Sequence, residues 1–208
     1  MSRRGAPEVN AGSMADIAFL LLIFFLATTT IEKDKGIARQ LPPKQEEDAP
    51  EPPKLKQKNI FVVLVNKDDQ LLVEEKPMDL GDLRQAAIDF IDNGGAPAGS
   101  PEYCSHCKGR KDPASSDNPD KAVISVQNDR LTSYKMYIAV QNELVAAYNF
   151  LRDRESQRLY GWNFTEVKRQ IDEGKFNGDI EATEEKLKNI QKLVPLKLSE
   201  AEPKKQGE

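Results

Sequence analysis

The sequence predicts a single N-terminal transmembrane helix followed by a small α+β domain, in which helices cover one face of a mixed sheet. Two observations predict this fold class. Nearly all the concentrated hydrophobicity of the 208-residue chain lies in one run near the N-terminus. Beyond that run, short β-branched segments alternate with segments of helical periodicity. No second apolar run is long enough to cross a bilayer, so a polytopic membrane protein is excluded.

Composition narrows the classes of function. The 30 basic and 34 acidic residues give a net charge of -4 without a basic stripe, so nucleic acid is not an expected partner. Two cysteines and one histidine exclude a disulfide-dense scaffold and a self-sufficient zinc site, so no metal is expected. The chain has no phosphate-binding glycine loop and no G-x-S-x-G motif, and His106 is too isolated to be expected as a base. We therefore expect neither an enzyme nor a cofactor.

The first predicted element is a transmembrane helix over residues 13–31. Its apolar part, residues 14–31, carries one charge and would extend about 27 Å as a helix, close to the roughly 30 Å of a hydrocarbon core. The preceding residues 1–12 contain Arg3 and Arg4, whereas charges of both signs follow the run. The positive-inside rule therefore predicts a single-pass inner-membrane protein with a cytoplasmic N-terminus and a periplasmic C-terminal domain.

A secretory signal peptide is the competing interpretation, because two arginines followed by an apolar run resemble its first two regions. Two features oppose it. Asp16 lies at the start of the apolar run, and three threonines stand where small residues should guide cleavage. A twin-arginine signal fits less well, because polar residues follow the arginine pair and the apolar run begins too far downstream. An uncleaved anchor is favoured.

Asp16 has two interpretations. It can form a capping box with Ser13 as the N-cap, so that the carboxylate interacts with the helix dipole. It can also be an intramembrane carboxylate that faces a partner or a wet cavity, where ionisable groups are costly and usually functional. Both remain open and can coexist. The residues that share its helix face, and so form the expected packing or pore face, are Ser13, Leu20, Ile23, Ala27 and Thr30.

A proline-rich linker is predicted over residues 32–58, because five prolines among charged residues prevent a packed core there. The periplasmic domain is predicted over residues 59–198. It begins with strands at 59–65 and 70–74, which a turn cluster joins as a hairpin. A helix follows from an Asp79 N-cap to the Asn-Gly-Gly stop at 93–95.

Residues 94–120 are predicted to form a long surface loop, since they are rich in Pro, Gly, Ser and Asp. The loop holds Cys104 and Cys107. Because it is expected outside the cytoplasm, a local disulfide is the favoured interpretation. Half of a zinc site completed by a second subunit is the next, and thioredoxin-like chemistry fits least, because no strand-helix context frames the motif.

The remaining elements follow from periodicity and capping. A strand is predicted at 122–128, and Thr132 or Ser133 can cap a long helix with one buried stripe that reaches Leu151. The charge run at 152–158 is interpreted as a solvated face. The last predicted elements are helices at 165–172 and 181–192, a strand at 193–198 that Pro195 confines to a sheet edge, and a polar tail at 199–208.

These features together resemble the ExbD/TolR family over residues 9–150. The resemblance rests on Val9-Asn10, the small residues before Asp16 and the unbroken apolar run after it. Gly36-Ile37 with Leu41-Pro42 is similar to the family's juxtamembrane element, and the hairpin before residue 79 is similar to its exterior domain. The Cys-containing insertion at 94–120 and the charged extension at 152–192 depart from the commoner pattern.

The resemblance implies a stator subunit of a motor that the proton-motive force drives. Such chains sit as a homodimer within an ExbB-like pentamer, and their motion energises a TonB-like protein for outer-membrane import. Asp16 matches the proton-carrying aspartate, with protons as the coupling ion. A partner segment can add to an exposed strand edge, although the edges can instead make only the homodimer. The expected partner-binding residues are Leu41, Pro42, Asn59, Phe61 and Val63.

Two alternatives remain. A TolR-like subunit of an envelope-maintenance motor, or another motor of this type, would use the same chemistry on a different load. A simple membrane-anchored periplasmic binding module would need Asp16 only as a cap.

Overall fold

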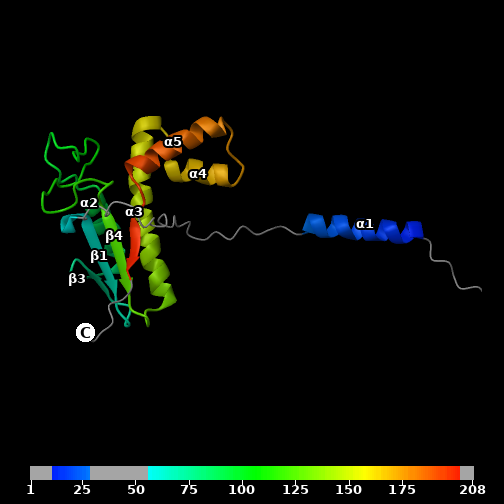
Figure 1. Ribbon diagram of the computed structural model, residues 1–208, viewed down its shortest axis with the longest axis horizontal. Helices are drawn as coiled ribbons and strands as arrows, with labels where there is room; N and C mark the ends of the chain where they lie inside the picture. The colour runs from blue at the N-terminus through cyan, green and yellow to red at the C-terminus, as the bar shows by residue number, and fades with distance from the viewer. Residues whose placement is uncertain (1–10, 29–55, 202–208) are drawn as a thin grey trace, which may run out of the picture. The chain divides into compact units, whose positions relative to one another are not determined.

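The computed structural model describes residues 11–28 and 56–201 (Figure 1). They belong to two compact units, Met1–Glu51 and Pro52–Glu208, which are described separately. The predicted linker 32–58 therefore lies outside the described residues, apart from its last three positions. There the second unit opens with the short 3-10 helix η1 (Gln57–Asn59).

The described part of the first unit is α1 (Ala11–Thr28), an apolar helix of 18 residues. Its large hydrophobic side chains from Met14 to Phe25 are between 46% and 63% exposed. The predicted span 13–31 extends past Thr28 into residues that are not described. Within residues 11–28 and 56–201, no helix reaches both the length and the apolarity needed to cross a membrane.

The second unit is built on a five-stranded sheet in the order β3-β2-β1-β4-β5. The central strand β1 (Ile60–Val65) pairs antiparallel with β2 (Leu71–Val73) and parallel with β4 (Val123–Asn128). The edges are β3 (Lys76–Met78), antiparallel to β2, and β5 (Leu198–Ala201), parallel to β4. The predicted mixed sheet of an α+β domain is confirmed.

Alternation of side chains gives the sheet one buried face. In β1, Phe61, Val63 and Val65 are buried, whereas the intervening residues are half-buried. The β1-β2 turn forms because the Asn66 side-chain oxygen accepts hydrogen bonds from the backbone N–H groups of Asp68 and Gln70. The period of two therefore places every second residue of the hairpin in the core.

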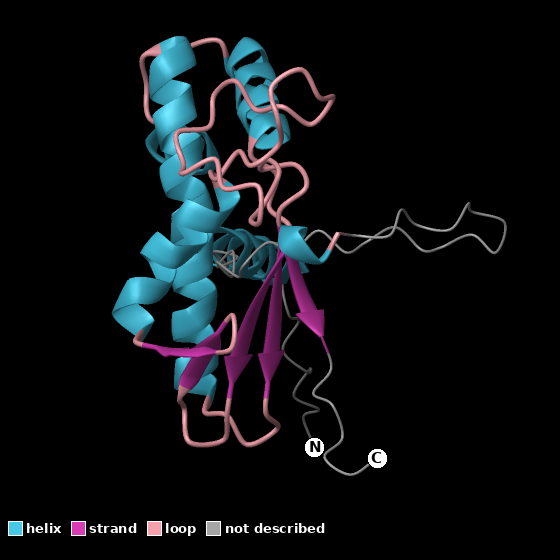
Figure 2. Ribbon diagram, turned by 90° about the vertical axis from the view of Figure 1, so that its left-hand side faces the viewer, coloured by secondary structure: helices cyan, strands magenta, loops and turns pink. Residues whose placement is uncertain are grey.

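Two helices, α2 (Leu80–Ile91) and α3 (Tyr134–Tyr160), cover that buried face (Figure 2). Their apolar residues, including Leu83 and Leu144, join the strand residues in one cluster. Helix α3 begins where the Ser133 side chain accepts a hydrogen bond from the N–H of Met136. It ends at Gly161, whose φ of 75° lies in the left-handed region that favours glycine.

The C-terminal part of α3 departs from its predicted environment. Within the charge run 152–158, Arg152, Glu155 and Ser156 are buried, so the interpretation of this run as a solvated face is wrong. Helices α4 (Phe164–Asp172) and α5 (Ile180–Leu193) pack against this part of α3, and they confirm the predicted helices at 165–172 and 181–192.

The last strand also differs from its prediction. Residues 193–198 were expected to form it, but α5 runs to Leu193 and Val194 is buried in the core. The strand β5 forms only from Leu198, beyond Pro195, and it does lie at a sheet edge. Because proline cannot donate to a ladder, the pairing starts after it.

Candidate functional site

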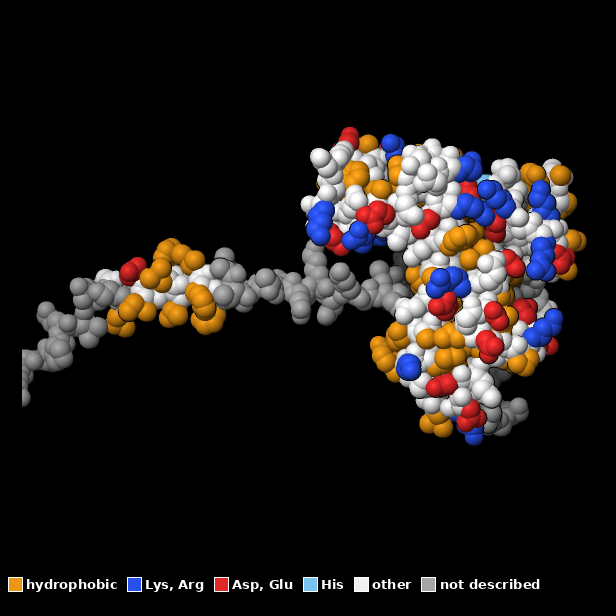
Figure 3. All heavy atoms as spheres, turned by 180° about the vertical axis from the view of Figure 1, so that it is seen from behind, with side chains coloured by type: hydrophobic (Ala, Val, Ile, Leu, Met, Phe, Trp, Pro, Cys, Tyr) orange, Lys and Arg blue, Asp and Glu red, His pale blue; other side chains and the backbone are white. Residues whose placement is uncertain are grey.

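The proton-carrying candidate Asp16 lies in α1 with its side chain exposed, and it is the only charged residue of that helix. Hydrophobic side chains cover most of the rest of α1 (Figure 3). Leu20 and Ile23 follow Asp16 at helical spacing and are exposed as well. Ser13 is the third residue of α1, so it does not precede the helix as an N-cap would. Ala27 is also in α1, and Thr30 lies outside the described residues.

Of the expected partner-binding residues, Leu41 and Pro42 lie outside the described part of the chain. Asn59, Phe61 and Val63 are buried within the domain. In β1, residues 60–65 pair with β4, whereas only residues 63–65 also pair with β2. Binding of a partner at residues 59–63 stays a prediction.

The sheet edges lie elsewhere. The edge strand β3 has three residues with a proline in the middle, and proline has no N–H to donate. The other edge, β5, has four residues and no proline. A strand addition would therefore find a better ladder on β5.

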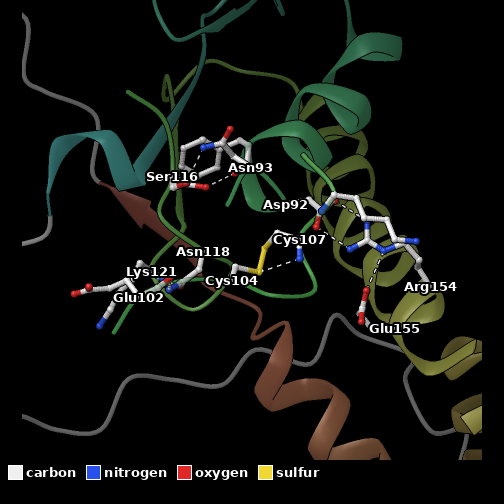
Figure 4. The surroundings of a disulfide bond; sticks show 12 residues. Asp92, Asn93, Glu102, Cys104, Cys107, Ser116, Asn118, Lys121, Arg154 and Glu155 are labelled. Carbon is white, nitrogen blue, oxygen red and sulfur yellow. Dashed lines mark hydrogen bonds and ion pairs between the residues drawn. A yellow bond between two sulfur atoms is a disulfide. The ribbon is translucent and has the colours of Figure 1, made fainter. Parts of the chain in front are cut away.

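The loop at residues 94–120 contains a disulfide between Cys104 and Cys107, the pairing that the sequence favours (Figure 4). Both cysteines are buried. The loop packs closely at its start, because a Cβ at Gly94 would lie 2.8 Å from the Cβ of Cys107, and the φ of Gly94 is 66°. Only glycine combines that backbone conformation with that contact.

Buried polar contacts hold the rest of the loop to the domain. The Asn93 side-chain amide donates to the backbone oxygens of Asp112 and Ser116, each at 2.8 Å. The Asp117 carboxylate accepts a hydrogen bond from the Asn59 side chain at 3.1 Å and forms an ion pair with Lys58 at 2.6 Å. These contacts fix the predicted surface loop to the domain, although many of its side chains, such as Lys111 and Pro113, are exposed.

Asp92, which follows α2, joins the loop to the C-terminal part of α3. Its carboxylate accepts two hydrogen bonds from the Arg154 guanidinium, at 2.6 and 2.7 Å, and one from the N–H of Lys108 at 3.2 Å (Figure 4). Arg154 and Arg158 also pair with the fully buried Glu155, at 3.1 and 2.8 Å. The hydrogen bonds from Arg154 to Asp92 raise the pKa of Arg154.

These charged residues were missed at the level of sequence, although a signal was present. Residues 152, 155 and 156 continue the helical spacing of the buried α3 stripe beyond Leu151. The charges of Arg152 and Glu155 concealed the pattern. The Cys-containing loop at 94–120 and the charge run that starts at residue 152 therefore meet at Asp92.

His106 lies beside this network. Burial is the main cause that lowers the pKa of the His106 imidazole. Its Nε2 is buried without a hydrogen-bond partner among the described residues. A hollow of about 440 Å³ adjoins the ring and is lined by Ser105, His106, Cys107, Lys108, Arg158, Leu159 and Leu193.

A larger hollow of about 990 Å³ lies where β1 and β4 end. Three aspartates contribute its charged lining, including Asp69. The Asp69 carboxylate accepts hydrogen bonds from the hydroxyl and the N–H of Ser133, which hold the pKa of Asp69 below its ordinary value. That carboxylate therefore supports the start of α3.

Comparison with known proteins agrees with the residue pattern at the N-terminus. The family model described as Biopolymer transport protein ExbD/TolR matches residues 2–151. No curated protein matches the chain. The family match includes Asp16, the sheet up to β4 and the Cys-containing loop, and it ends as the charge run of α3 begins. Since it spans more than half of the sequence, the chain belongs to the ExbD/TolR family of biopolymer transport proteins.

Proposed function

We propose that this chain is the proton-coupled stator subunit of an inner-membrane motor, and that it energises TonB-dependent import through the outer membrane. The family supports the proposal, because its members are subunits of transport motors with an inner-membrane anchor and a periplasmic domain. Residues 13–31 would form the anchor, with the N-terminus in the cytoplasm. A homodimer of these chains would assemble with an ExbB-like pentamer and act on a TonB-like protein.

The observation that carries the proposal is the position of Asp16. It is the single charge in an otherwise apolar helix whose large side chains are exposed. A lipid or helix-bundle environment would bury those side chains favourably but would penalise a charged carboxylate. A carboxylate at this position is therefore best explained by a function that needs it, and binding and releasing protons is such a function. Protons would be the coupling ion, and no cofactor is needed.

The test is a pair of substitutions at Asp16 in the full chain, reconstituted with its ExbB-like partner in proteoliposomes. Asp16→Asn keeps the shape but cannot titrate, so we expect proton uptake, followed with a pH-sensitive dye, to be abolished. Asp16→Glu keeps the carboxyl group and should retain part of the flux. Co-purification with the partner should be unchanged in both variants. Wild-type proton uptake by Asp16→Asn would refute the proposal.

The load on the motor is a separate question, because the family model covers both ExbD and TolR. Deletion of the gene should abolish receptor-dependent nutrient uptake if the role is ExbD-like. Leakage of periplasmic proteins with normal nutrient uptake would instead assign the TolR-like role. A phenotype in neither assay, together with an active Asp16→Asn variant, would favour a simple anchored binding module.

We further propose that the partner segment adds to β5, the edge strand without a proline. Main-chain hydrogen bonds would hold an extended segment there. Hydrogen exchange of the full chain, with and without overlapping peptides of the TonB-like protein, tests this. Residues 198–201 should exchange more slowly with a binding peptide, whereas residues 76–78 of β3 provide the internal control. Protection confined to the exposed face of α3 would show that the partner docks differently.

A further inference from the structure

Three potential metal ligands gather within the Cys-containing loop. The Sγ atoms of Cys104 and Cys107 and a ring nitrogen of His106 all lie within 4.8 Å of one another. Both cysteines are less than 7% exposed, and His106 is half-buried. In the structure the two sulfurs are joined in the disulfide. The same loop therefore holds two thiolate precursors and an imidazole within the span of one coordination sphere.

The imidazole has no other assignment in the fold. Its buried Nε2 makes no hydrogen bond to any described residue, and an unsatisfied buried polar atom costs free energy. A neutral imidazole has one ring nitrogen with a free lone pair. A neutral imidazole is the form that binds metal ions.

We propose that reduction of the Cys104–Cys107 disulfide opens a zinc site whose ligands are Cys104, His106 and Cys107. Thiolate and imidazole are the preferred ligands of zinc, which binds four groups in a tetrahedron. Three ligands come from the loop. The hollow of about 440 Å³ beside His106 and Cys107 would admit water to the fourth position.

The reaction balances with a dithiol as reductant. The dithiol loses two electrons and two protons and becomes a disulfide, while the Cys104–Cys107 bond breaks and each sulfur gains a proton. Zinc then displaces both thiol protons to solvent as the two Zn–S bonds form. Disulfide and zinc are therefore alternative states of the same pair of cysteines.

The surroundings hold the loop in place without the disulfide. The backbone N–H of Cys107 donates to the Sγ of Cys104 at 3.1 Å, a contact that would also stabilise a thiolate. On the other side of the motif, the N–H groups of Lys108 and Gly109 bind the carboxylate and the backbone oxygen of Asp92. These bonds do not involve the S–S bond, so reduction leaves the ligands close together.

Local charge also permits a cation. The carboxylates of Asp92 and Glu155 act on His106, as do the guanidinium groups of Arg154 and Arg158. These carboxylates and guanidinium groups already pair with one another. The two thiolates would then supply the negative charge that zinc needs. The site does not rest on the motor function proposed above.

Cobalt(II) is a direct probe, because its spectrum reports both the ligands and their geometry. The full chain is reduced with a phosphine, freed of reductant without oxygen, and titrated with cobalt. We expect one equivalent to bind with sulfur-to-cobalt charge-transfer bands and the intense visible bands of four-coordination. Zinc should bleach these bands by displacing cobalt. The oxidised chain should show neither signal.

Matched variants in the same motif assign the ligands. His106→Gln should weaken zinc binding, measured against a competing chelator, by at least about 100-fold, the upper end of the effect of losing an outer-shell partner. Cys104→Ser should remove the charge-transfer bands. Ser105→Ala changes a residue between the ligands that is not one of them, so its affinity should equal that of the wild type.

Three results would overturn the proposal. The first is a pale six-coordinate spectrum without sulfur bands, and the second is equal zinc affinity of His106→Gln and the wild type. The third is loss of the native circular dichroism on reduction, since the site requires the loop to stay docked.

Discussion

Apolar side chains join the sheet to α2 and to the first half of α3, whereas charged side chains join the Cys-containing loop to the second half of α3. The first region contains the main core, with Val63, Ile124 and Leu144 fully buried. The second is organised around Asp92 and Arg154, with only a small apolar cluster of Phe164, Leu187 and Ile190 beyond it.

Because the contacts differ, the two regions should respond differently to amino-acid substitutions. Apolar burial is non-directional and adds up over many contacts, so the loss of one side chain weakens the core everywhere. A buried ion pair stabilises only when both partners are present, because a single buried charge is costly. A substitution in the core should therefore destabilise the whole domain, whereas a substitution in the Asp92 network should loosen only the segments that this network joins.

The largest expected effect comes from Leu144→Ala, which leaves a cavity between α3 and the sheet. We expect the free energy of unfolding to fall by about 3 kcal/mol, within the range for buried leucine to alanine. Denaturant unfolding measures it. Phe150→Ala, at a 54% exposed position of the same helix, is the control and should change stability by less than about 0.5 kcal/mol. Equal effects of the two variants would contradict the placement of the core.

A smaller effect is expected for Asp92→Ala, which leaves Arg154 without its two hydrogen bonds to that carboxylate. The expected loss is about 2 kcal/mol, typical of hydrogen bonds to charged groups, because Arg154 is 20% exposed and keeps Glu155. Hydrogen exchange should quicken at Lys108 and in the second half of α3 while β1 stays protected.

Asp89→Ala is the matched control for that substitution. Asp89 lies on the same helix, but its side chain is 44% exposed and its pairing with Arg110 is longer, at 3.5 Å. Exposed pairs of this kind contribute at most about 1 kcal/mol. Faster exchange in β1 as well as in the loop after Asp92→Ala would show that the two regions unfold together, and would remove the distinction between them.

The smallest effect is a pH dependence at the other anchor of the loop. Burial acts to raise the pKa of Asp117, but hydrogen bonds from Lys58 and Asn59 and the nearby positive charges outweigh it and hold the pKa below the ordinary 3.8. The carboxylate therefore stabilises the fold above about pH 4, and this contribution is lost as the pH falls through the folded-state pKa.

Asp117→Asn isolates that contribution. At neutral pH it should cost about 1 kcal/mol, the ordinary value of a hydrogen bond. The difference in unfolding free energy between wild type and variant should shrink as the pH falls below about 4. A constant difference from neutral to strongly acidic pH would show that the Asp117 charge does not hold the loop.

Elements whose residues carry a local period or cap could be predicted before the fold was known. The alternation in 59–65, the Ser133 cap and the helices at 165–172 and 181–192 depend on neighbours a few residues away, so each could be predicted alone. The same holds for the Cys104–Cys107 pair, because its partners are three residues apart. The role of Asp16 stays a prediction of the sequence and the family.

The strand order and the burial of charged side chains depend on contacts between distant segments. Residues 59–65 look like any half-buried strand, and only pairing with β2 and β4 makes β1 the central strand of the sheet. From the sequence, Arg154 and Glu155 are expected in solvent because charged side chains favour water. In the structure Asp92, 62 positions from Arg154, binds the guanidinium group and offsets the cost of burying it. His106 is adjacent to the cysteines in the sequence, but only the fold brings it close to the charged groups of Asp92, Arg154 and Glu155. Strand neighbours and charge partners come from distant segments, so only the folded chain can supply them.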